Sequence, residues 1–335
     1  MEFGNIYTTV DLHAAGEPLR VVTGGVPQIK GDTILARRRF VRDNLDHVRR
    51  TLILEPRGHR DMYGCLLTPP VSEKADFGVI FMHNEGYSDM CGHGIIALAT
   101  LAVAQELVDR TAPETRVGFD APAGFIEAFV EFDGSRVGAV RFRNVPSFLY
   151  RRDVRVNTRS FGELTVDIAF GGAFYAYLEG SQAGIDVHPG NLSALVDLGD
   201  QVKHAARGAL TIRHPLEPEL DSLYGTIISG AARAPGSSQA NVCVFADSEV
   251  DRSPTGTGTA GRVAQLHARG RLGLEQPLVN ESIIGTVFTG KAVGETRVGD
   301  YDAIIPEIAG RAHLVGFSQW PVDPHDPVGQ GFLLR

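Results

Sequence analysis

Two copies of one short pattern, far apart in the chain, limit the folds that this sequence can adopt. Cys91-Gly-His-Gly94 and Thr255-Gly-Thr-Gly258 each stand before a helix-like segment, at an offset of 164 residues (255 − 91), and the same offset aligns Phe81 with Phe245. Upstream, the offset falls to 161 and then to 156 for further matches: Tyr63-Gly64 with Tyr224-Gly225, and Asp11, Gly16 and Gly24 with Asp167, Gly172 and Gly180. Small loop insertions in a duplicated domain produce such a gradual drift, so the sequence predicts two similar halves.

The length of the chain agrees with two halves. A chain of 335 residues has the size of about two domains, each able to bury its own core. We expect a first domain of residues 1–125 that contains Cys91 and is completed by residues 312–335, and a second of residues 126–311 that contains Thr255. The segment Asp120-Ala-Pro-Ala-Gly124 has the turn chemistry of a linker.

The local pattern predicts many short strands and few helices. Apolar or alternating runs bounded by Gly, Pro and Asp predict strands at Arg20–Thr23, Thr51–Leu54, Gly78–Met82, Gly138–Phe142, Ala173–Leu178 and Asn241–Phe245. A helix is expected from His93 to about Val108, apolar on nearly every side, which is typical of a buried helix. A second, shorter and more polar, is expected from Thr257 to about Arg269, with Gly270 ending it.

Composition excludes several classes of partner. The net charge of −8 and the pI near 5.8 argue against a polyanion, and we interpret the clusters Arg37-Arg38-Arg39 and Arg49-Arg50 as solvated faces. No apolar run approaches the roughly 18 residues that span a bilayer, and residues 1–10 lack the features of a signal peptide. We therefore expect no nucleic acid and no membrane partner. A cytoplasmic location follows, and a homodimer is compatible with these features.

The three cysteines divide into two kinds. They are odd in number and widely spaced, which is no disulfide framework and fits a reducing cytoplasm. Cys65 and Cys243 lie in apolar, strand-like contexts, where a cysteine acts as a small hydrophobic residue. Cys91 instead lies where a buried helix begins, and the unpaired N–H groups and partial positive charge at that end favour the reactive thiolate. The adjacent glycines would let a substrate carboxylate approach the same N–H groups.

The second copy of the pattern lies within Asp251-Arg-Ser-Pro-Thr-Gly-Thr-Gly-Thr-Ala-Gly261, which contains a literal G-x-G-x-x-G. In a dinucleotide site this motif makes a tight turn directly between a strand and a helix. Here Asp251 and Pro254 lie between the strand that ends near Phe245 and the first glycine. We favour two helix N-termini that converge on one small site, where Asp251 binds a substrate ammonium or iminium nitrogen. A capping or surface role for Asp251 is the alternative.

Four stretches together resemble the proline racemase family over nearly the whole chain. They are Asp11-x-His-x-x-Gly16-Glu-Pro-x-Arg20, Pro56-Arg-Gly-His-x-Asp-Met-Tyr-Gly64, Met90-Cys-Gly-His-Gly94 and Asp251-Arg-Ser-Pro-x-Gly-Thr-Gly258. The resemblance implies an α/β (α+β), diaminopimelate-epimerase-like fold: two pseudo-symmetric domains, each with a curved β-sheet around a central helix, and an active site in the cleft between them. It also implies that no cofactor is used. Carried onto this sequence, the catalytic cysteine is Cys91, the second catalytic position is Thr255, and the substrate contacts are Gly92, His93, Asp251, Gly256 and Thr257.

One departure from the family pattern decides the expected reaction. The family's racemases and epimerases carry a second cysteine where this chain has Thr255. Inversion needs an acid and a base on opposite faces of the α-carbon, and an alcohol is too weak for either near neutral pH. The carbanion formed by removal of the α-proton would then expel a 3-hydroxyl group by β-elimination. The Cys91/Thr255 pair is similar to the family's trans-3-hydroxy-L-proline dehydratases, so we expect dehydration of that imino acid, through an enamine, to Δ1-pyrroline-2-carboxylate.

Other interpretations remain open from the residues alone. The chain could be a hydroxyproline 2-epimerase or proline racemase, a catalytically silent amino-acid-binding protein or, with least support, a cysteine hydrolase. Because residues two apart at a helix start do not face each other well, we assign His93 a role in contacting or orienting the ligand. Tyr63 and Phe245 either line the ring pocket or belong to the core. The histidines show no metal-ligand spacing, so no metal is expected.

Overall fold

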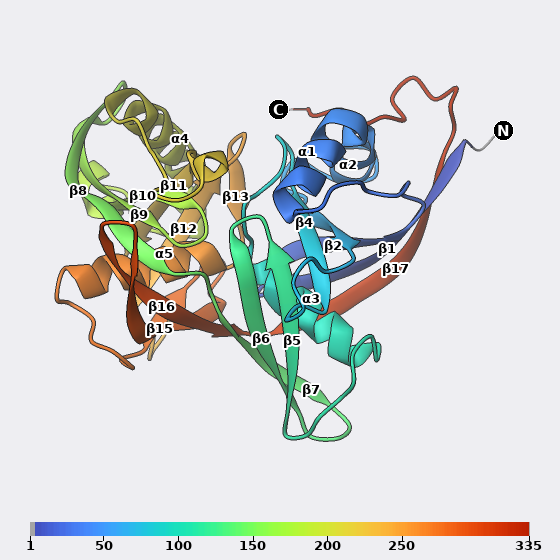
Figure 1. Ribbon diagram of the computed structural model, residues 1–335. Coiled ribbons are helices and arrows are strands. Elements are labelled where there is room, and N and C mark those ends of the chain that lie inside the picture. Colours follow the sequence, from blue (N-terminus) through green and yellow to red (C-terminus); the bar gives the residue numbers. More distant parts are fainter. Residues whose placement is uncertain (1–3, 335) are drawn as a thin grey trace. The chain divides into compact units, whose positions relative to one another are not determined.

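The chain divides into two compact units. The computed structural model describes residues 4–334, and its first unit is Met1–Val140 with Arg311–Arg335, while the second is Arg141–Gly310 (Figure 1). The boundary expected after residue 125 falls inside a strand of the first unit, because residues 120–124 form the end of one strand, a two-residue hairpin turn and the start of the next strand. No helix in residues 4–334 has the length and apolarity needed to cross a membrane.

The first unit is a curved sheet with helices on both faces. Its strands are β1 (Asn5–Ala14), β2 (Glu17–Gly24), β3 (Gly64–Thr68), β4 (Phe77–Met82), β5 (Glu114–Ala121), β6 (Gly124–Phe132) and β17 (Ala312–Val322), and its helices are α1 (Ile34–Asn44), α2 (Asp46–Ile53) and α3 (Gly92–Ala104). The strands pair in the order β17–β1–β2–β3–β4–β5–β6. β7 (Val137–Arg143) crosses the boundary between the units.

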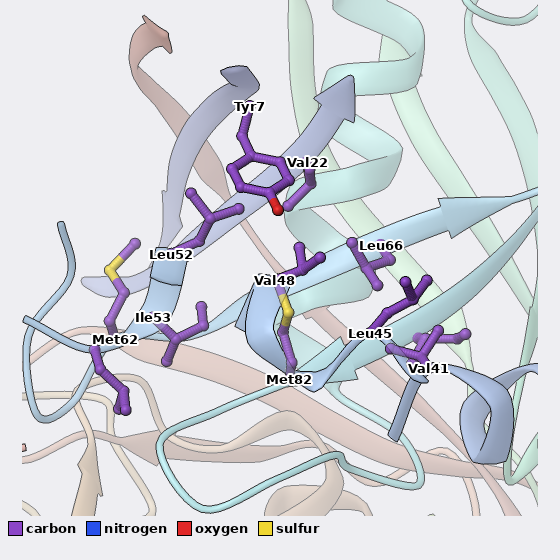
Figure 2. Packing of buried hydrophobic residues seen from close by; sticks show 12 residues of the cluster. Tyr7, Val22, Val41, Leu45, Val48, Leu52, Ile53, Met62, Leu66 and Met82 are labelled. Carbon is purple, nitrogen blue, oxygen red and sulfur yellow. The ribbon is translucent and has the colours of Figure 1, made fainter. Parts of the chain in front are cut away.

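Helix α3 fills the concave side of this sheet. It contacts β17 and β1 toward one end of the strand order and β5 and β6 at the other, and its residues from Gly92 to Val103 are all buried. The other face is covered by α1 and α2. Figure 2 shows Val41 of α1, Val48 of α2 and Leu45 between the two helices beside Leu66 and Met82 of the sheet. Because both faces are covered, the central strands read as continuous apolar runs rather than as alternating ones.

The second unit has its sheet closed into a ring. Its strands are β8 (Ser147–Thr158), β9 (Gly162–Phe170), β10 (Phe174–Glu179), β11 (Leu223–Gly230), β12 (Gln239–Phe245), β13 (Glu249–Asp251), β14 (Leu278–Glu281), β15 (Val287–Val298) and β16 (Tyr301–Gly310), its helices α4 (Leu192–Ala209) and α5 (Gly256–Ala268), and its 3-10 turns Gly180–Ala183, Pro189–Asn191 and Pro218–Leu220. The pairing runs β8–β9–β10–β11–β12–β14–β15–β16 and back to β8. Helix α5 contacts β8, β9, β10, β15 and β16, whereas α4 packs on β11 and β12 with Gly199 against Val244.

The internal topology of the units confirms the duplication. In the first unit β2–β3 is parallel, β3–β4 antiparallel and β4–β5 parallel, and the second repeats this with β10–β11, β11–β12 and β12–β14. Helices α3 and α5 each have 13 residues and begin directly after Cys91 and Thr255. Both also end in the same way. Glu106 and Gly270 are left-handed, and the next residue's N–H bonds back to the fifth residue before it.

Two of the expected elements differ from the structure, one in where it ends and the other in its type. The first helix ends at Ala104 rather than near Val108, because the left-handed Glu106 stops it. The strand expected at Thr51–Leu54 is wrong, since most of this run is the last turn of α2, where Thr51, Leu52 and Ile53 are all buried. A short, fully apolar run does not distinguish a strand from a buried helix end by periodicity alone. Helices α1, α2 and α4 were not expected.

The arginine clusters are not simply solvated faces, which corrects their interpretation. Arg38 on α1 forms an ion pair with Asp89, and both side chains are largely buried. Arg49 on α2 is buried and donates hydrogen bonds to the carbonyl groups of His83 and Asn84. The buried guanidinium groups therefore hold the loop that leads to Cys91, which is a structural use of charge that composition does not reveal.

Candidate active site

Cys91 is the N-cap of α3. Its backbone is extended (φ −142°, ψ 111°), and its sulfur accepts a hydrogen bond from the Gly94 N–H at 3.2 Å. Its carbonyl accepts the Ile95 N–H at 3.0 Å, so the first turn is anchored on Cys91 through both side chain and backbone. The side chain is only 4% exposed. The sulfur therefore lies at the positive end of a buried helix, in a place where burial keeps water away.

His93 lies against this sulfur, contrary to expectation. The distance from Cys91 Sγ to His93 Nδ1 is 3.2 Å. Residues two apart within a helix do not face each other, but Cys91 precedes the helix and has an extended backbone, so its side chain turns back over the first turn. The Tyr63 ring meets the imidazole edge-on at a centroid distance of 4.8 Å, and the Tyr63 hydroxyl is hydrogen-bonded to Ser88. The imidazole is thus fixed in contact with the thiol.

Gly94 is required by the same packing. A methyl group there would lie 2.4 Å from Cε1 of Phe81 and 3.0 Å from Sγ of Cys91. We expect Gly94→Ala to displace the sulfur and to lower kcat/KM for the reaction proposed below at least about tenfold, since a 1 Å misplacement can cost about 10²-fold. Steady-state kinetics measure this loss. The matched control is Gly86→Ala, where no described atom lies within 4 Å of the added methyl. Equal losses in both variants would contradict this explanation.

The His83 ring contacts the Tyr63 ring, and its burial makes the stability of the first unit depend on pH. Burial, with the nearby Arg49 guanidinium, lowers the pKa of His83 from 6.5 to about 3. Below pH 6.5 the unfolded chain binds a proton that the native state does not, so the free energy of unfolding falls as the pH drops toward 3. We expect a loss of about 1.6 kcal/mol between pH 6.5 and 5 from this group. Urea unfolding of His83→Asn should lack this loss, and parallel stability curves for the two proteins would contradict it.

Thr255 is the corresponding N-cap of α5, in a strained conformation. Its φ is +63°, which a β-branched residue rarely adopts. Its N–H donates to Ser253 Oγ at 3.1 Å, and its carbonyl accepts from the Thr259 N–H at 2.7 Å. The side chain is 5% exposed, and its Oγ1 has no hydrogen-bond partner among the described residues. A strained backbone and an unpaired buried hydroxyl are both costly, and such features cluster at ligand sites.

The other residues expected in the second half of the site surround Thr255 in sequence and are buried. Asp251 ends β13, is 3% exposed and accepts the Ser253 N–H at 2.7 Å, which rules out a surface role for it. Gly256 begins α5. The Thr257 hydroxyl is hydrogen-bonded to the Tyr175 hydroxyl at 2.8 Å, so a core partner already occupies it.

Two glycines of the G-x-G-x-x-G motif allow neighbouring side chains to pack directly against the backbone of α5. A methyl at Gly258 would lie 2.6 Å from Cδ1 of Ile227 and 3.0 Å from Cγ2 of Thr255, and one at Gly261 would lie 2.1 Å from the Tyr177 hydroxyl. Between β12 and α5 the chain forms β13, which is antiparallel to β12. This arrangement lacks the direct strand–turn–helix step of a dinucleotide site.

The aromatic residues and remaining cysteines lie in the core. Phe245 stacks on Tyr224 at a centroid distance of 5.3 Å, and in the first unit Tyr63 lies 6.3 Å from Phe81. Tyr63 and Phe245 are buried, so a role in lining the ring pocket stays a prediction. Cys65 and Cys243 are buried in strands, as expected of small hydrophobic residues. Burial raises the pKa of the Cys65 thiol, which keeps it protonated and unreactive.

Sequence reasoning missed several residues that hold these positions. Ser88 and Tyr175 bond to Tyr63 and Thr257, and Arg38 pairs with Asp89 two residues before the cysteine. Nothing in a single sequence marks these distant partners. Ser253, by contrast, stands inside the Asp251–Gly261 motif, and its position two residues before Thr255 could have suggested a turn that supports Thr255.

Comparison with known proteins gives one consistent family. A sequence model of the family described as proline racemase matches residues 9–333. A protein from Burkholderia ambifaria named trans-3-hydroxy-L-proline dehydratase is 57% identical over 335 residues, covering 100% of both chains. One from Burkholderia multivorans named 3-hydroxyproline 2-epimerase is 56% identical, again over 100% of both. The crystal structure of a hydroxyproline epimerase from Agrobacterium vitis, with bound trans-4-hydroxy-L-proline, is 32% identical with a TM-score of 0.94, covering 100% of this chain and 96% of that one.

Proposed function

The chain belongs to the proline racemase family, and we propose that it is a cofactor-independent hydro-lyase that converts trans-3-hydroxy-L-proline to Δ1-pyrroline-2-carboxylate. The observation that carries this proposal is threonine at position 255. This alcohol stands where an epimerase would need a second thiol, so Cys91 is the one reactive thiol of the proposed site. Relatives named as dehydratases, 46–57% identical over essentially their whole length, support it.

The stereochemistry of the substrate suits a single thiol. In the trans isomer the 3-hydroxyl lies on the ring face opposite the carboxylate, which is the face that carries the α-hydrogen. One group on that face can therefore reach both the proton to be removed and the hydroxyl that departs. Cys91, in contact with His93 and with the N-terminus of α3, has surroundings that favour its thiolate form.

The proposed reaction balances on Cys91 alone. The Cys91 thiolate takes the α-proton and becomes a thiol, while the electron pair of the C–H bond forms the C2–C3 double bond of the enamine. The C3–O bond breaks, and the thiol returns its proton to the departing hydroxyl, so water leaves and the thiolate is restored. The enamine then tautomerises to Δ1-pyrroline-2-carboxylate. No redox agent or external acid is needed.

The remaining site residues bind and orient the ring in this proposal. Backbone N–H groups at Gly92 and Gly256, at the first turns of α3 and α5, would bind the carboxylate. Asp251, buried and two residues before Ser253, would bind the ring nitrogen. Thr255 would contact the ring face away from Cys91, where its hydroxyl is too weak an acid to deliver a proton.

Epimerisation is the second candidate, and a specific observation keeps it in view. The relative named 3-hydroxyproline 2-epimerase is about as similar to this chain as the relatives named dehydratases. Overall identity therefore does not separate the two reactions, and the proposal depends on position 255. An enzyme with one competent thiol should eliminate water, whereas inversion needs a second acid across the ring.

The test is incubation of the purified chain with trans-3-hydroxy-L-proline, trans-4-hydroxy-L-proline and L-proline in D₂O, followed by NMR. We expect loss of the 3-hydroxy compound alone, with formation of the cyclic imine. Formation of D-epimers from any of the three would instead support the epimerase. Binding without turnover of any substrate would support a silent amino-acid-binding protein. Either outcome would overturn the proposal.

We also propose that the enzyme works in the cytoplasm. The proposed chemistry requires Cys91 as a reduced thiol and fails if this sulfur is oxidised. A reducing compartment maintains this state. Cell fractionation with an antibody to the chain tests this, and recovery in an oxidising compartment would contradict it.

A further inference from the structure

The strained conformation of Thr255 needs an explanation within the second unit. A threonine at φ +63° with a buried, unpaired hydroxyl persists only if its surroundings enforce it. On its N-terminal side the peptide bond to Pro254 sets the direction of the Thr255 backbone. The orientation of the Pro254 carbonyl group therefore controls where the Thr255 side chain points.

Three donors converge on that carbonyl oxygen. Asn241 Nδ2 donates at 3.0 Å, Thr259 Oγ1 at 3.1 Å and Asn280 Nδ2 at 3.3 Å. Asn241 lies on β12 and Asn280 on β14, whereas Thr259 belongs to the first turn of α5 itself. The carbonyl is thus fastened to two neighbouring strands of the ring and cannot rotate without losing several buried hydrogen bonds at once.

Asn241 has the clearest single task among the three donors. Asn280 Nδ2 also bonds to Thr259 Oγ1, at 2.8 Å, and so divides its donors between two acceptors. Asn241 is fully buried, and its Oδ1 has no hydrogen-bond partner among the described residues. An unpaired buried amide oxygen costs free energy that an apolar side chain would not. The hydrogen bond from Asn241 Nδ2 to the Pro254 carbonyl is therefore the interaction that explains an amide at this position.

We propose that Asn241 is a positioning residue that holds the Pro254 carbonyl and thereby orients Thr255 toward the substrate ring. This inference rests on the proposed dehydratase function. Asn241 acts through the Pro254–Thr255 peptide bond rather than on the substrate. Its loss should therefore lower turnover more than it lowers affinity, because the ring would still bind but would lie incorrectly relative to Cys91.

Two substitutions separate positioning from simple packing. Asn241→Leu keeps the size of the side chain and removes the donor, and we expect kcat for dehydration to fall about 10- to 100-fold with less than about threefold change in KM. Asn241→Asp removes the donor when ionised and restores one when protonated. Its kcat relative to the unaltered enzyme should therefore rise as the pH is lowered, which loss of packing alone does not produce.

The control is Ser229→Ala. Ser229 is directly opposite Asn241 in the β11–β12 register and is equally buried, but its Oγ has no partner among the described residues. It should leave kcat and KM within about twofold. Circular dichroism and melting temperature establish that each variant is folded. If the leucine variant does not fold, the pH profile of the aspartate variant decides the matter.

The outcomes distinguish this inference from the function on which it rests. Absence of imine formation by the unaltered enzyme would contradict the proposed function. An active enzyme whose folded Asn241→Leu variant keeps kcat within twofold, or whose Asn241→Asp variant has a pH-independent relative kcat, would overturn the positioning role alone. A loss in Ser229→Ala as large as that in Asn241→Leu would likewise assign the effect to packing.

Discussion

Replacement of Cys91 by serine is expected to lower kcat for dehydration of trans-3-hydroxy-L-proline by about 10³- to 10⁴-fold. Serine keeps the shape of the side chain and can still accept the Gly94 N–H bond that caps α3. The alcohol, however, is ionised far less readily than a thiol and cannot remove the α-proton near neutral pH. Rates of imine formation, followed by NMR with purified protein, measure the loss.

The matched control for this variant is Cys65→Ala. Cys65 is fully buried in β3, and burial raises the pKa of its thiol, so it takes no part in proton transfer. We expect kcat to stay within about twofold of the unaltered enzyme, because the substitution removes a single small buried group. Retention of a tenth or more of the activity by Cys91→Ser would contradict the assignment of the base.

The second large effect is expected from Thr255→Cys, which should add inversion to elimination. A thiol at this position supplies the acid that the proposed mechanism lacks on the second ring face. The Thr255 hydroxyl makes no hydrogen bond to the described residues, so a sulfur in its place breaks none. From trans-3-hydroxy-L-proline we expect cis-3-hydroxy-D-proline, rising from below about 1% of product to roughly a tenth or more, with deuterium at the α-carbon in D₂O.

Thr255→Ser is the control for that experiment. It removes the β-branch, which relieves the backbone at φ +63°, but it keeps the weakly acidic hydroxyl. No D-epimer should form. Chiral chromatography of the products separates the two cases. Formation of the D-epimer by the serine variant, or its absence from a folded and active cysteine variant, would show that acidity at position 255 does not decide the reaction.

The duplicated architecture could be predicted from sequence because its signals are local and repeated. The glycines after Cys91 and Thr255 must be small, since methyl groups at Gly94 and Gly258 would collide with those residues and with Phe81 and Ile227. Such steric requirements persist in both copies and remain visible as an offset. Most of the β-strands that were recognised are covered on both faces and consist almost entirely of apolar residues.

The helices on the outer faces were missed for a different reason. α1 carries a run of arginines, and its burial depends on partners distant in sequence, such as the Arg38–Asp89 pair. α2 ends in the apolar run Thr51–Ile53, which also fits a strand. Only the tertiary structure shows that Val41 of α1 and Leu52 and Ile53 of α2 pack in one core cluster with residues of the sheet (Figure 2).

The sequence predicts which residues form the candidate site, but it did not predict their local geometry. The motifs predict Cys91 and Asp251 as reactive or binding groups. Cys91 is buried directly before α3, and Asp251 is buried at the end of β13, a few residues before α5. The contact between Cys91 and His93 was not foreseen, because it depends on an extended N-cap backbone. The strained backbone of Thr255 could not be predicted either, since the residue type alone does not reveal a backbone dihedral angle.

A crystal structure with pyrrole-2-carboxylate, a flat analogue of the carbanion, tests the central claim most directly. The quantity to measure is the position of the nearest side-chain atom on each face of the analogue's C2. We expect Sγ of Cys91 on one face and Oγ1 of Thr255 on the other, with no thiol, carboxyl or imidazole on the Thr255 face. A second acidic group across the ring from the sulfur, with Thr255 elsewhere, would contradict the assignment of dehydration over inversion.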